Sequence, residues 1–193
     1  MADFLASLPL GKLLPPGHHG FLGAPGIRLK TVAADACTLV AGRDLPAVIV
    51  KARDAFSVDL TDGPRRSAGA GIDFIGIGPG RWLALALETG LAQRLEAALA
   101  PAASIFEQGG GLVLFEAEGG AIDRVLAKLA PLDLHPDVFP VGAAATTTAA
   151  HVNMTFWRCE GGAWRFAVGR SFVAAFLRLF SCAAAAFGLD WTG

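Results

Sequence analysis

The sequence predicts an α+β fold in which one pattern of strands and helices occurs twice within a single domain. Short apolar runs bounded by glycine and proline alternate with stretches in which apolar residues recur every three or four positions. The order strand, helix, strand, strand, helix is found in both halves, and 193 residues are enough to bury a core. We therefore expect one duplicated domain over residues 35–193, with repeats at about 35–108 and 109–188 and antiparallel sheets covered by helices.

Residues 1–34 are expected to form an extended arm. They contain Pro9, Pro15, Pro16 and Pro25 and several glycines, and no hydrophobic period is sustained. An arm of this kind often lies on a neighbouring chain. The first residues also lack the basic start and uninterrupted apolar stretch of a signal peptide, so secretion is not predicted.

The first repeat follows the arm. Its predicted elements are a strand at 37–41, a helix at 45–56, strands at 72–77 and 82–87, a helix at 91–99 and a strand at 104–107. Asp44 directly precedes the first helix, where its carboxylate can act as an N-cap. The two middle strands are separated by Gly78-Pro79-Gly80-Arg81, which predicts a β-hairpin.

The second repeat has the same order but no predicted final strand. Its elements are a strand at 112–116, a helix at 122–129, hairpin strands at 152–158 and 164–168, and a last helix at 171–188. Ser171 is the expected N-cap of that helix, and Gly188 is the expected residue just past its end. Arg178 lies near the middle of this apolar stretch, which favours a core helix over a membrane span.

Composition narrows the classes of function. The chain is 53% hydrophobic and 17% charged, whereas ordinary soluble domains are roughly 45–50% apolar and about 25% charged. This low charge indicates burial against a partner. Sixteen basic and seventeen acidic residues are interspersed, which excludes the clustered cations that nucleic-acid binding needs. Three cysteines lie far apart in apolar segments, as expected in a reducing cytoplasm.

Motifs that carry chemistry are not found. The run Gly76-Ile77-Gly78-Pro79-Gly80 matches neither the G-x-G-x-x-G spacing nor the Walker A spacing of phosphate-binding loops, and it predicts a turn. Gly109-Gly110-Gly111 predicts a flexible reversal of the chain. The four histidines have no partner at a metal-ligand spacing: His18, His19, His135 and His151. No serine or cysteine lies in a nucleophile motif. We therefore assign no catalytic, cofactor-binding or metal-binding residue, while a site assembled from distant residues stays open.

The most specific stretch is residues 131–140. Its candidate motif is Leu132, Asp133, Leu134, His135, Pro136, Phe139 and Pro140. Two carboxylates and a histidine within five positions are compatible with acid–base chemistry. The prolines equally indicate a rigid connection whose polar side chains bind backbone groups, and we favour this structural interpretation, in which the motif forms an interface.

This stretch resembles the signature region of the sarcosine oxidase gamma subunit family. The resemblance extends from Val125 to Arg158 and includes Leu132-Asp133-Leu134-His135-Pro136 and Phe139-Pro140-Val141-Gly142. The hairpin at Gly78–Leu83 and the segment Phe166–Phe172 also match the family's pattern, so the resemblance covers roughly residues 72–188. One departure lies at Ile105–Gly109, where the family usually has an Asp-(Leu/Val)-Ser-Asp strand.

The resemblance implies a fold, partners and a role. The fold would be two ferredoxin-like halves, as in the folate-binding domain of glycine-cleavage aminomethyltransferase and TrmE-like proteins. The partners would be alpha, beta and delta subunits, and FAD, FMN, NAD and tetrahydrofolate would belong to the assembly, with no cofactor in this chain. The chain would be a structural subunit of an enzyme that demethylates sarcosine to glycine and passes formaldehyde to tetrahydrofolate.

Two other functions stay open on the sequence. A folate-binding or aminomethyl-transfer protein acting on its own would need a pocket of ligand size with an acidic group, and Asp133, His135 and Glu107 are the first candidates. A stand-alone hydrolase or transferase would need a cleft with groups of perturbed pKa. Likeness of fold alone decides neither.

Overall fold

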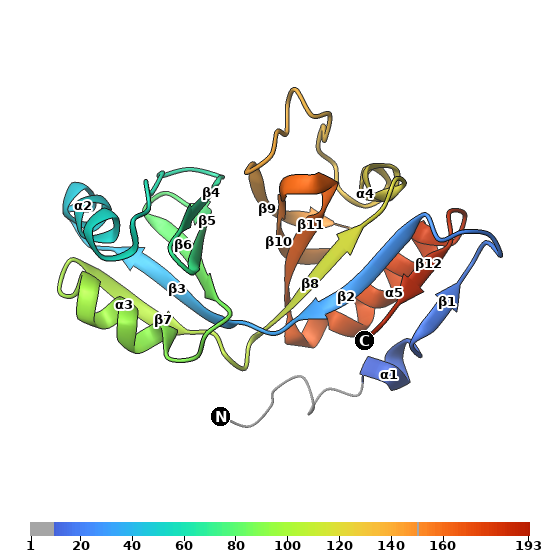
Figure 1. Ribbon diagram of the computed structural model, residues 1–193, viewed down its shortest axis with the longest axis horizontal. Coiled ribbons are helices and arrows are strands. Elements are labelled where there is room, and N and C mark those ends of the chain that lie inside the picture. Colours follow the sequence, from blue (N-terminus) through green and yellow to red (C-terminus); the bar gives the residue numbers. More distant parts are fainter. Residues whose placement is uncertain (1–9, 150) are drawn as a thin grey trace. The chain divides into compact units, whose positions relative to one another are not determined.

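The computed structural model describes residues 10–149 and 151–193, which divide into two compact units (Figure 1). The central unit comprises Ala33–Gly110 and Gly142–Ala145. The terminal unit comprises the residues up to Val32, Gly111–Val141 and Thr146–Gly193. Each unit is built around its own sheet.

The central unit holds a five-stranded sheet with the order β4-β5-β6-β3-β7. Its elements are β3 (Asp35–Ala41), α2 (Leu45–Phe56), β4 (Arg66–Gly69), β5 (Ile72–Gly78), β6 (Arg81–Ala86), α3 (Leu91–Leu99) and β7 (Ala103–Glu107). All neighbouring strands are antiparallel. Apart from the edge strand β4, which the sequence did not predict, this is the order of a ferredoxin-like half. Apolar residues of both helices and of the strands form one buried core, and Figure 1 shows both helices lying against this sheet.

Local chemistry explains where these elements begin and turn. The Asp44 carboxylate accepts a hydrogen bond from the Ala47 amide at 3.0 Å, which confirms the predicted N-cap of α2. The β5–β6 connection is the predicted hairpin, with a bulge at Gly76 and Gly78. A Cβ at Gly76 would overlap the carbonyl oxygen of Gly63, so only glycine fits there.

The terminal unit holds a seven-stranded sheet with the order β1-β12-β2-β8-β11-β10-β9. The predicted second repeat supplies β8 (Leu112–Glu118), α4 (Ile122–Leu129), β10 (Val152–Arg158), β11 (Trp164–Gly169) and α5 (Val173–Ala184), and the same stretch adds β9 (Ala144–Ala149), which the repeat pattern did not predict. Further elements are α1 (Leu10–Leu13), β1 (Gly17–His19), β2 (Ile27–Val32), β12 (Leu189–Trp191) and short 3₁₀ turns at Glu160–Gly162 and Arg170–Phe172. The first two residues of β9 fall in the segment that groups with the central unit.

The described part of the N-terminal segment, residues 10–34, differs from the expected arm. Ile27 and Leu29 are fully buried in β2, whereas Arg28 and Lys30 are exposed on its other face. This alternation has the period of a strand. The prolines and glycines of the segment lie before β2, and because they indicate irregular structure the strand after them was not predicted. Residues 1–9 of the expected arm lie outside the described residues.

Four further expectations need correction. The repeat has a final strand, because β12 follows α5, and β2 lies between β12 and β8. Ser171 is not the N-cap of α5, since it lies in the preceding 3₁₀ turn and the cap position is Phe172. The helix ends at Ala184, four residues before Gly188. The Gly109–Gly111 stretch connects the two sheets and does not reverse the chain between paired strands.

Aromatic residues form the core between the sheet of the terminal unit and α5. The Phe176 ring on α5 lies 4.8 Å from Phe115 on β8 and 5.7 Å from Phe166 on β11. Phe180, one helical turn later, lies 5.9 Å from Phe166. Such pairs add about 0.5–1.5 kcal/mol each beyond the burial of their surface. They explain why α5 remains on this face without a side-chain cap.

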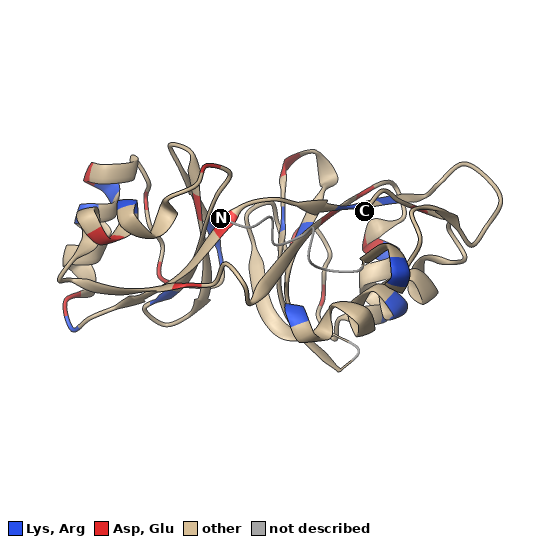
Figure 2. Cartoon of the chain, turned by 90° about the horizontal axis from the view of Figure 1, so that it is seen from below, with Lys and Arg blue, Asp and Glu red and all other residues tan. Residues whose placement is uncertain are grey.

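The opposite face of the same sheet carries a ladder of alternating charge. The strand register places Asp190 of β12 beside Arg28 of β2, and Arg28 beside Glu118 of β8. In the same way Glu116 of β8 lies between Lys30 and Arg165, at 2.8 Å from each. Burial alone would raise the pKa of Glu116, but the hydrogen bonds from both cations outweigh it and lower the pKa. Figure 2 shows both signs of charge interspersed along the chain, as the sequence predicts.

Candidate functional site

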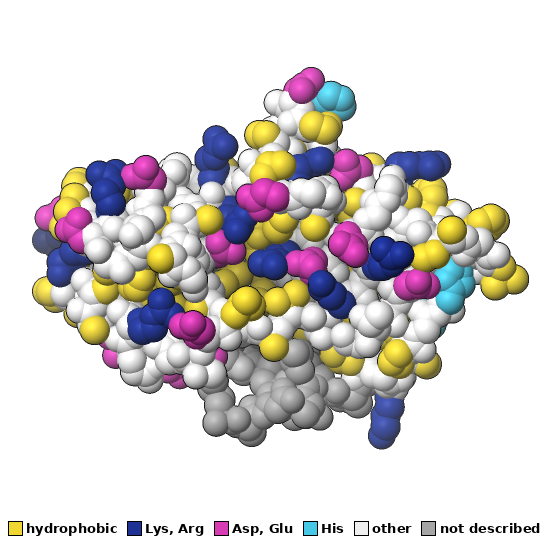
Figure 3. Space-filling model, viewed as in Figure 1, with side chains coloured by type: hydrophobic (Ala, Val, Ile, Leu, Met, Phe, Trp, Pro, Cys, Tyr) yellow, Lys and Arg dark blue, Asp and Glu magenta, His cyan; other side chains and the backbone are white. Residues whose placement is uncertain are grey.

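The segment singled out in the sequence forms a loop, residues 131–141, that projects from the terminal unit between α4 and β9 (Figure 1). Two of its side chains, Leu134 and Phe139, are buried and anchor it. Three apolar side chains point outward: Leu132, Val138 and Val141 are 40%, 61% and 49% exposed. The space-filling view shows the loop standing out from the surface with hydrophobic and charged side chains on it (Figure 3).

The polar side chains of the loop bind its own backbone. The Asp133 carboxylate accepts from the His135 amide at 2.9 Å, and the His135 carbonyl accepts from the amides of Val138 and Phe139 at 2.9 and 2.7 Å. The His135 ring lies 3.5 Å from the Asp137 carboxylate, with both side chains largely exposed. Asp133 and His135 therefore shape a tight turn through hydrogen bonds within their own loop.

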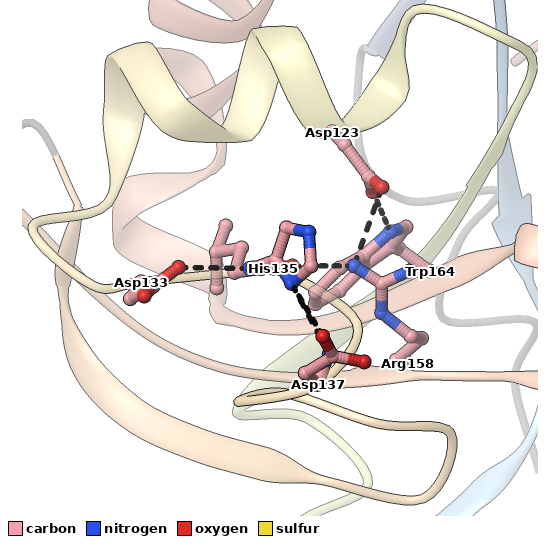
Figure 4. Close-up of polar contacts among 7 residues, drawn as sticks. Asp123, Asp133, His135, Asp137, Arg158 and Trp164 are labelled. Carbon is pink, nitrogen blue, oxygen red and sulfur yellow. Dashed lines mark hydrogen bonds and ion pairs between the residues drawn. The ribbon is translucent and has the colours of Figure 1, made fainter.

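A buried arginine fixes the loop to the sheet. Arg158, at the end of β10, donates from Nη2 to the Leu134 carbonyl at 2.7 Å and lies 3.3 Å from the Asp123 carboxylate (Figure 4). Its guanidinium lies 4.5 Å from the centre of the Trp164 ring, and Trp164 Nε1 donates to the other Asp123 oxygen at 2.8 Å. The arginine thus ties α4, β11 and the loop together, because each of its contacts belongs to a different element.

Aromatic stacking completes the anchor. The Phe139 ring lies 5.3 Å from Trp164 and 5.9 Å from Phe156, nearly parallel to both. A buried phenylalanine in such a cluster contributes about 3–5 kcal/mol, judged by what truncation to alanine costs. Arg158 and this aromatic stack therefore anchor the loop to the sheet at Leu134 and Phe139.

The described residues offer little for chemistry. They contain no group of three or more His, Cys, Asp or Glu side chains placed to hold a metal ion. Burial raises the pKa of the Cys37 thiol to about 11, so this cysteine stays protonated and is a poor nucleophile. Of the folate candidates, Glu107 is exposed at the end of β7 in the central unit, whereas Asp133 and His135 belong to the terminal unit.

One small cavity lies between α5 and the β9–β10 hairpin. Its lining is entirely apolar and includes Val152, Met154 and Phe176, and its volume of about 10 Å³ is that of a single water. A folate does not fit there. None of the described helices is long and apolar enough to cross a membrane.

The sequence motifs included Arg158 but missed its partners. Asp123 and Trp164 lie far from Leu134 in the sequence, so no local spacing connects them. The one available signal was an arginine directly after the apolar run of β10, where a charged residue requires a buried partner.

These features define a class of protein: a duplicated α+β module with an anchored loop that exposes apolar side chains and, among its described residues, no group of three or more side chains placed to hold a metal ion. Residues 39–186 match the model of the "Sarcosine oxidase, gamma subunit family". The chain belongs to this family, and the resemblance noted in the sequence is confirmed.

Individual relatives agree with this assignment. The sarcosine oxidase subunit gamma of Arthrobacter sp is 35% identical over 99 residues, which cover 50% of this chain and 49% of the relative. The match thus spans about half the length of that curated relative. A chain of the heterotetrameric sarcosine oxidase from Corynebacterium sp. U-96, solved in complex with pyrrole 2-carboxylate, superposes with a TM-score of 0.76 at 25% identity, and 88% of each chain is covered.

A more distant structure supports the fold alone. Glycine cleavage system aminomethyltransferase T from Bartonella henselae superposes with a TM-score of 0.62 at 13% identity, covering 88% of this chain and 48% of that one. The predicted α+β class with an aminomethyltransferase-like fold is therefore confirmed.

Proposed function

We propose that this chain is the non-catalytic gamma subunit of a heterotetrameric sarcosine oxidase, in which it binds the other subunits and stabilises their assembly. Alpha, beta and delta subunits are the proposed partners, and FAD, FMN, NAD and tetrahydrofolate bind to those subunits. The assembly acts in the cytoplasm and converts sarcosine to glycine with transfer of formaldehyde to tetrahydrofolate. The family match and the coverage of 88% of the Corynebacterium chain support this proposal.

The observation that carries the proposal is the 131–141 loop. Its motif Leu132, Asp133, Leu134, His135, Pro136, Phe139 and Pro140 is the proposed interface. The loop exposes three apolar side chains on a backbone that Arg158 and Phe139 already fix. A preorganised loop loses little conformational freedom on binding, so most of the free energy of apolar burial remains available for association. A docking element requires such a preorganised apolar surface. The exposed carboxylates of the loop, which contact groups within the loop itself, do not favour a catalytic role.

The experiment is co-expression of the chain with its proposed partners, followed by affinity purification and size-exclusion chromatography. Val138→Asp places a charge in the loop, and Val50→Asp is the matched control, because Val50 on α2 is 53% exposed and Val138 is 61% exposed. We expect the wild-type chain and the control to co-purify at equal stoichiometry and the loop variant to be lost.

Two outcomes would overturn parts of the proposal. Assembly without this chain, with normal sarcosine-dependent peroxide production, would refute its structural role. Tight binding of tetrahydrofolate by the isolated, monomeric chain would replace it with the folate-binding alternative. Equal retention of both variants would leave the subunit role intact and move the interface away from the loop.

A further inference from the structure

His18 on strand β1 makes two short contacts with groups that only accept hydrogen bonds. Its Nδ1 lies 2.7 Å from a carboxylate oxygen of Asp190 on β12, and its Nε2 lies 2.6 Å from the carbonyl oxygen of Phe21. The strand register pairs His18 directly with Asp190. Neither acceptor carries a proton near neutral pH, so both ring nitrogens must donate. An imidazole that donates from both nitrogens is the positively charged form.

We propose that protonated His18 is a clasp that fastens strand β1 and the loop at residues 20–25 to the C-terminal strand β12, and that loss of its proton opens this clasp. In the neutral ring one nitrogen carries a lone pair. That lone pair would face an oxygen at 2.6 or 2.7 Å, an arrangement in which two acceptors repel each other. One of the two contacts therefore has to break.

The clasp adds to the backbone pairing of β1 with β12 and to the hydrogen bond from Trp191 Nε1 to the Leu14 carbonyl at 2.8 Å. Strand β1 has three residues and lies at the edge of the sheet. The Phe21 amide donates to the Ala185 carbonyl at 2.8 Å, just past α5. Beyond this point Phe21 and Leu22 are 61% and 95% exposed. In this proposal the protonation state of His18 sets how firmly the Phe21 backbone is held, next to two exposed apolar side chains.

The surrounding charges support a stable imidazolium. The Phe21 carbonyl and then the Asp190 carboxylate raise the pKa of His18 above its ordinary value. On β2, Arg28 lies beside Asp190 in the register and 3.9 Å from Glu118 on β8. On β1 itself, His19 bonds to the Pro15 carbonyl at 2.8 Å.

Two more cations lie near the end of α5. Arg124 and Lys128 on α4 lie over the Phe187 ring, at 4.4 and 4.5 Å from its centre. Among the described residues, the charge of Asp190 also raises the pKa of His18. Because this pKa is raised on folding, the stabilisation is complete below the free histidine value of about 6.5 and is lost as pH rises through the folded value.

The test is an NMR titration of the full chain labelled with ¹⁵N at histidine, with the exposed His151 as the internal reference. We expect both His18 nitrogens to be protonated at pH 7 and to titrate above the ordinary histidine value of about 6.5. We also expect the exchange protection of the Phe21 amide to fall at least tenfold as His18 loses its proton. A neutral His18 at pH 7, or unchanged Phe21 protection across its titration, would overturn the proposal.

Variants separate the clasp from a general effect of pH. Asp190→Asn should lower the His18 midpoint, whereas His19→Gln, the matched control on the same strand, should leave both the midpoint and the Phe21 protection unchanged. In His18→Gln the pH dependence of Phe21 protection should disappear. The wild-type titration decides the proposal by itself if a variant fails to fold, and a midpoint unaffected by Asp190→Asn in a folded chain would count against it.

Discussion

Replacing Arg158 with methionine should destabilise the terminal unit by about 2–3 kcal/mol and release the 131–141 loop. The variant keeps the apolar stem of the side chain but removes the charge-assisted hydrogen bond to the buried Leu134 carbonyl, which is worth about 1.5–3 kcal/mol. It also removes the stacking on Trp164, about 0.5–1 kcal/mol, and an ion pair with a half-exposed Asp123 worth at most about 1 kcal/mol.

A smaller effect acts in the other direction. The Nε of Arg158 is buried and has no hydrogen-bond partner among the described residues, and methionine removes this group. An unsatisfied buried donor costs about 1–3 kcal/mol, so its removal returns part of the loss. For this reason the expected destabilisation of about 2–3 kcal/mol lies in the lower part of the range obtained by adding the three lost contacts. A second reason is that contacts made by one side chain are not additive.

The assay is urea unfolding followed by tryptophan fluorescence, together with hydrogen exchange of the Val138 and Phe139 amides. Both amides donate to the His135 carbonyl and report on the loop directly. Asp123→Asn is the comparison, because its amide oxygen can still accept from Trp164 Nε1 while the ion pair and the hydrogen bond from Arg158 are lost. We expect a smaller change than for Arg158→Met, since the bond to the Leu134 carbonyl and the stacking on Trp164 remain. A change under 0.5 kcal/mol for Arg158→Met, on the order of ordinary surface substitutions, with unaltered loop exchange, would refute the anchoring role.

Three further perturbations follow from the packing and the charges. Glu116→Gln should lower the free energy of unfolding by about 0.5–1 kcal/mol above pH 5. This difference from the wild-type chain should vanish as pH falls through the lowered pKa of Glu116, as measured by urea unfolding across pH. A pH-independent difference would contradict the prediction. A thiol reagent should modify only the exposed Cys182 in the native chain and all three cysteines after unfolding, and early reaction of a buried cysteine would contradict the core packing. Gly76→Ala should destabilise the central unit by about 1–3 kcal/mol, because the added Cβ would overlap the Gly63 backbone. Gly109→Ala is the control, because the added Cβ meets open space there, and it should change stability by under about 0.5 kcal/mol. Equal melting temperatures of the two variants would refute the close approach of Gly76 to Gly63.

The sequence predicts the elements whose signals are local. The helix at Leu45–Phe56 was found because its N-cap and its apolar period lie within a dozen residues, and the β5–β6 hairpin was found because its turn is rich in glycine and proline. Elements whose stability comes from distant partners were missed. The three-residue strand Leu189–Trp191 has no period to detect and exists because it pairs with β1 and β2.

The candidate site follows the same rule. The sequence singled out the segment at residues 131–140, since its prolines and the Asp133–His135 turn are local features, and its role as an interface stays a prediction. It could not identify what fixes the loop. Asp123, Arg158 and Trp164 come from α4, β10 and β11, and only the folded sheet brings them together.

The position of β2 shows how burial and charge divide their roles. Burial of Ile27 and Leu29 supplies about 1.5–3 kcal/mol each and makes β2 join the sheet. The ion pairs of Arg28 and Lys30 with β8 are worth at most about 1 kcal/mol each, too little to drive association. They act on register, because a slip by one residue would place both cations in the aromatic core and both apolar residues on the charged face. Burial therefore explains why an N-terminal strand inserts between β12 and β8, and the charge ladder explains why it does so in one register.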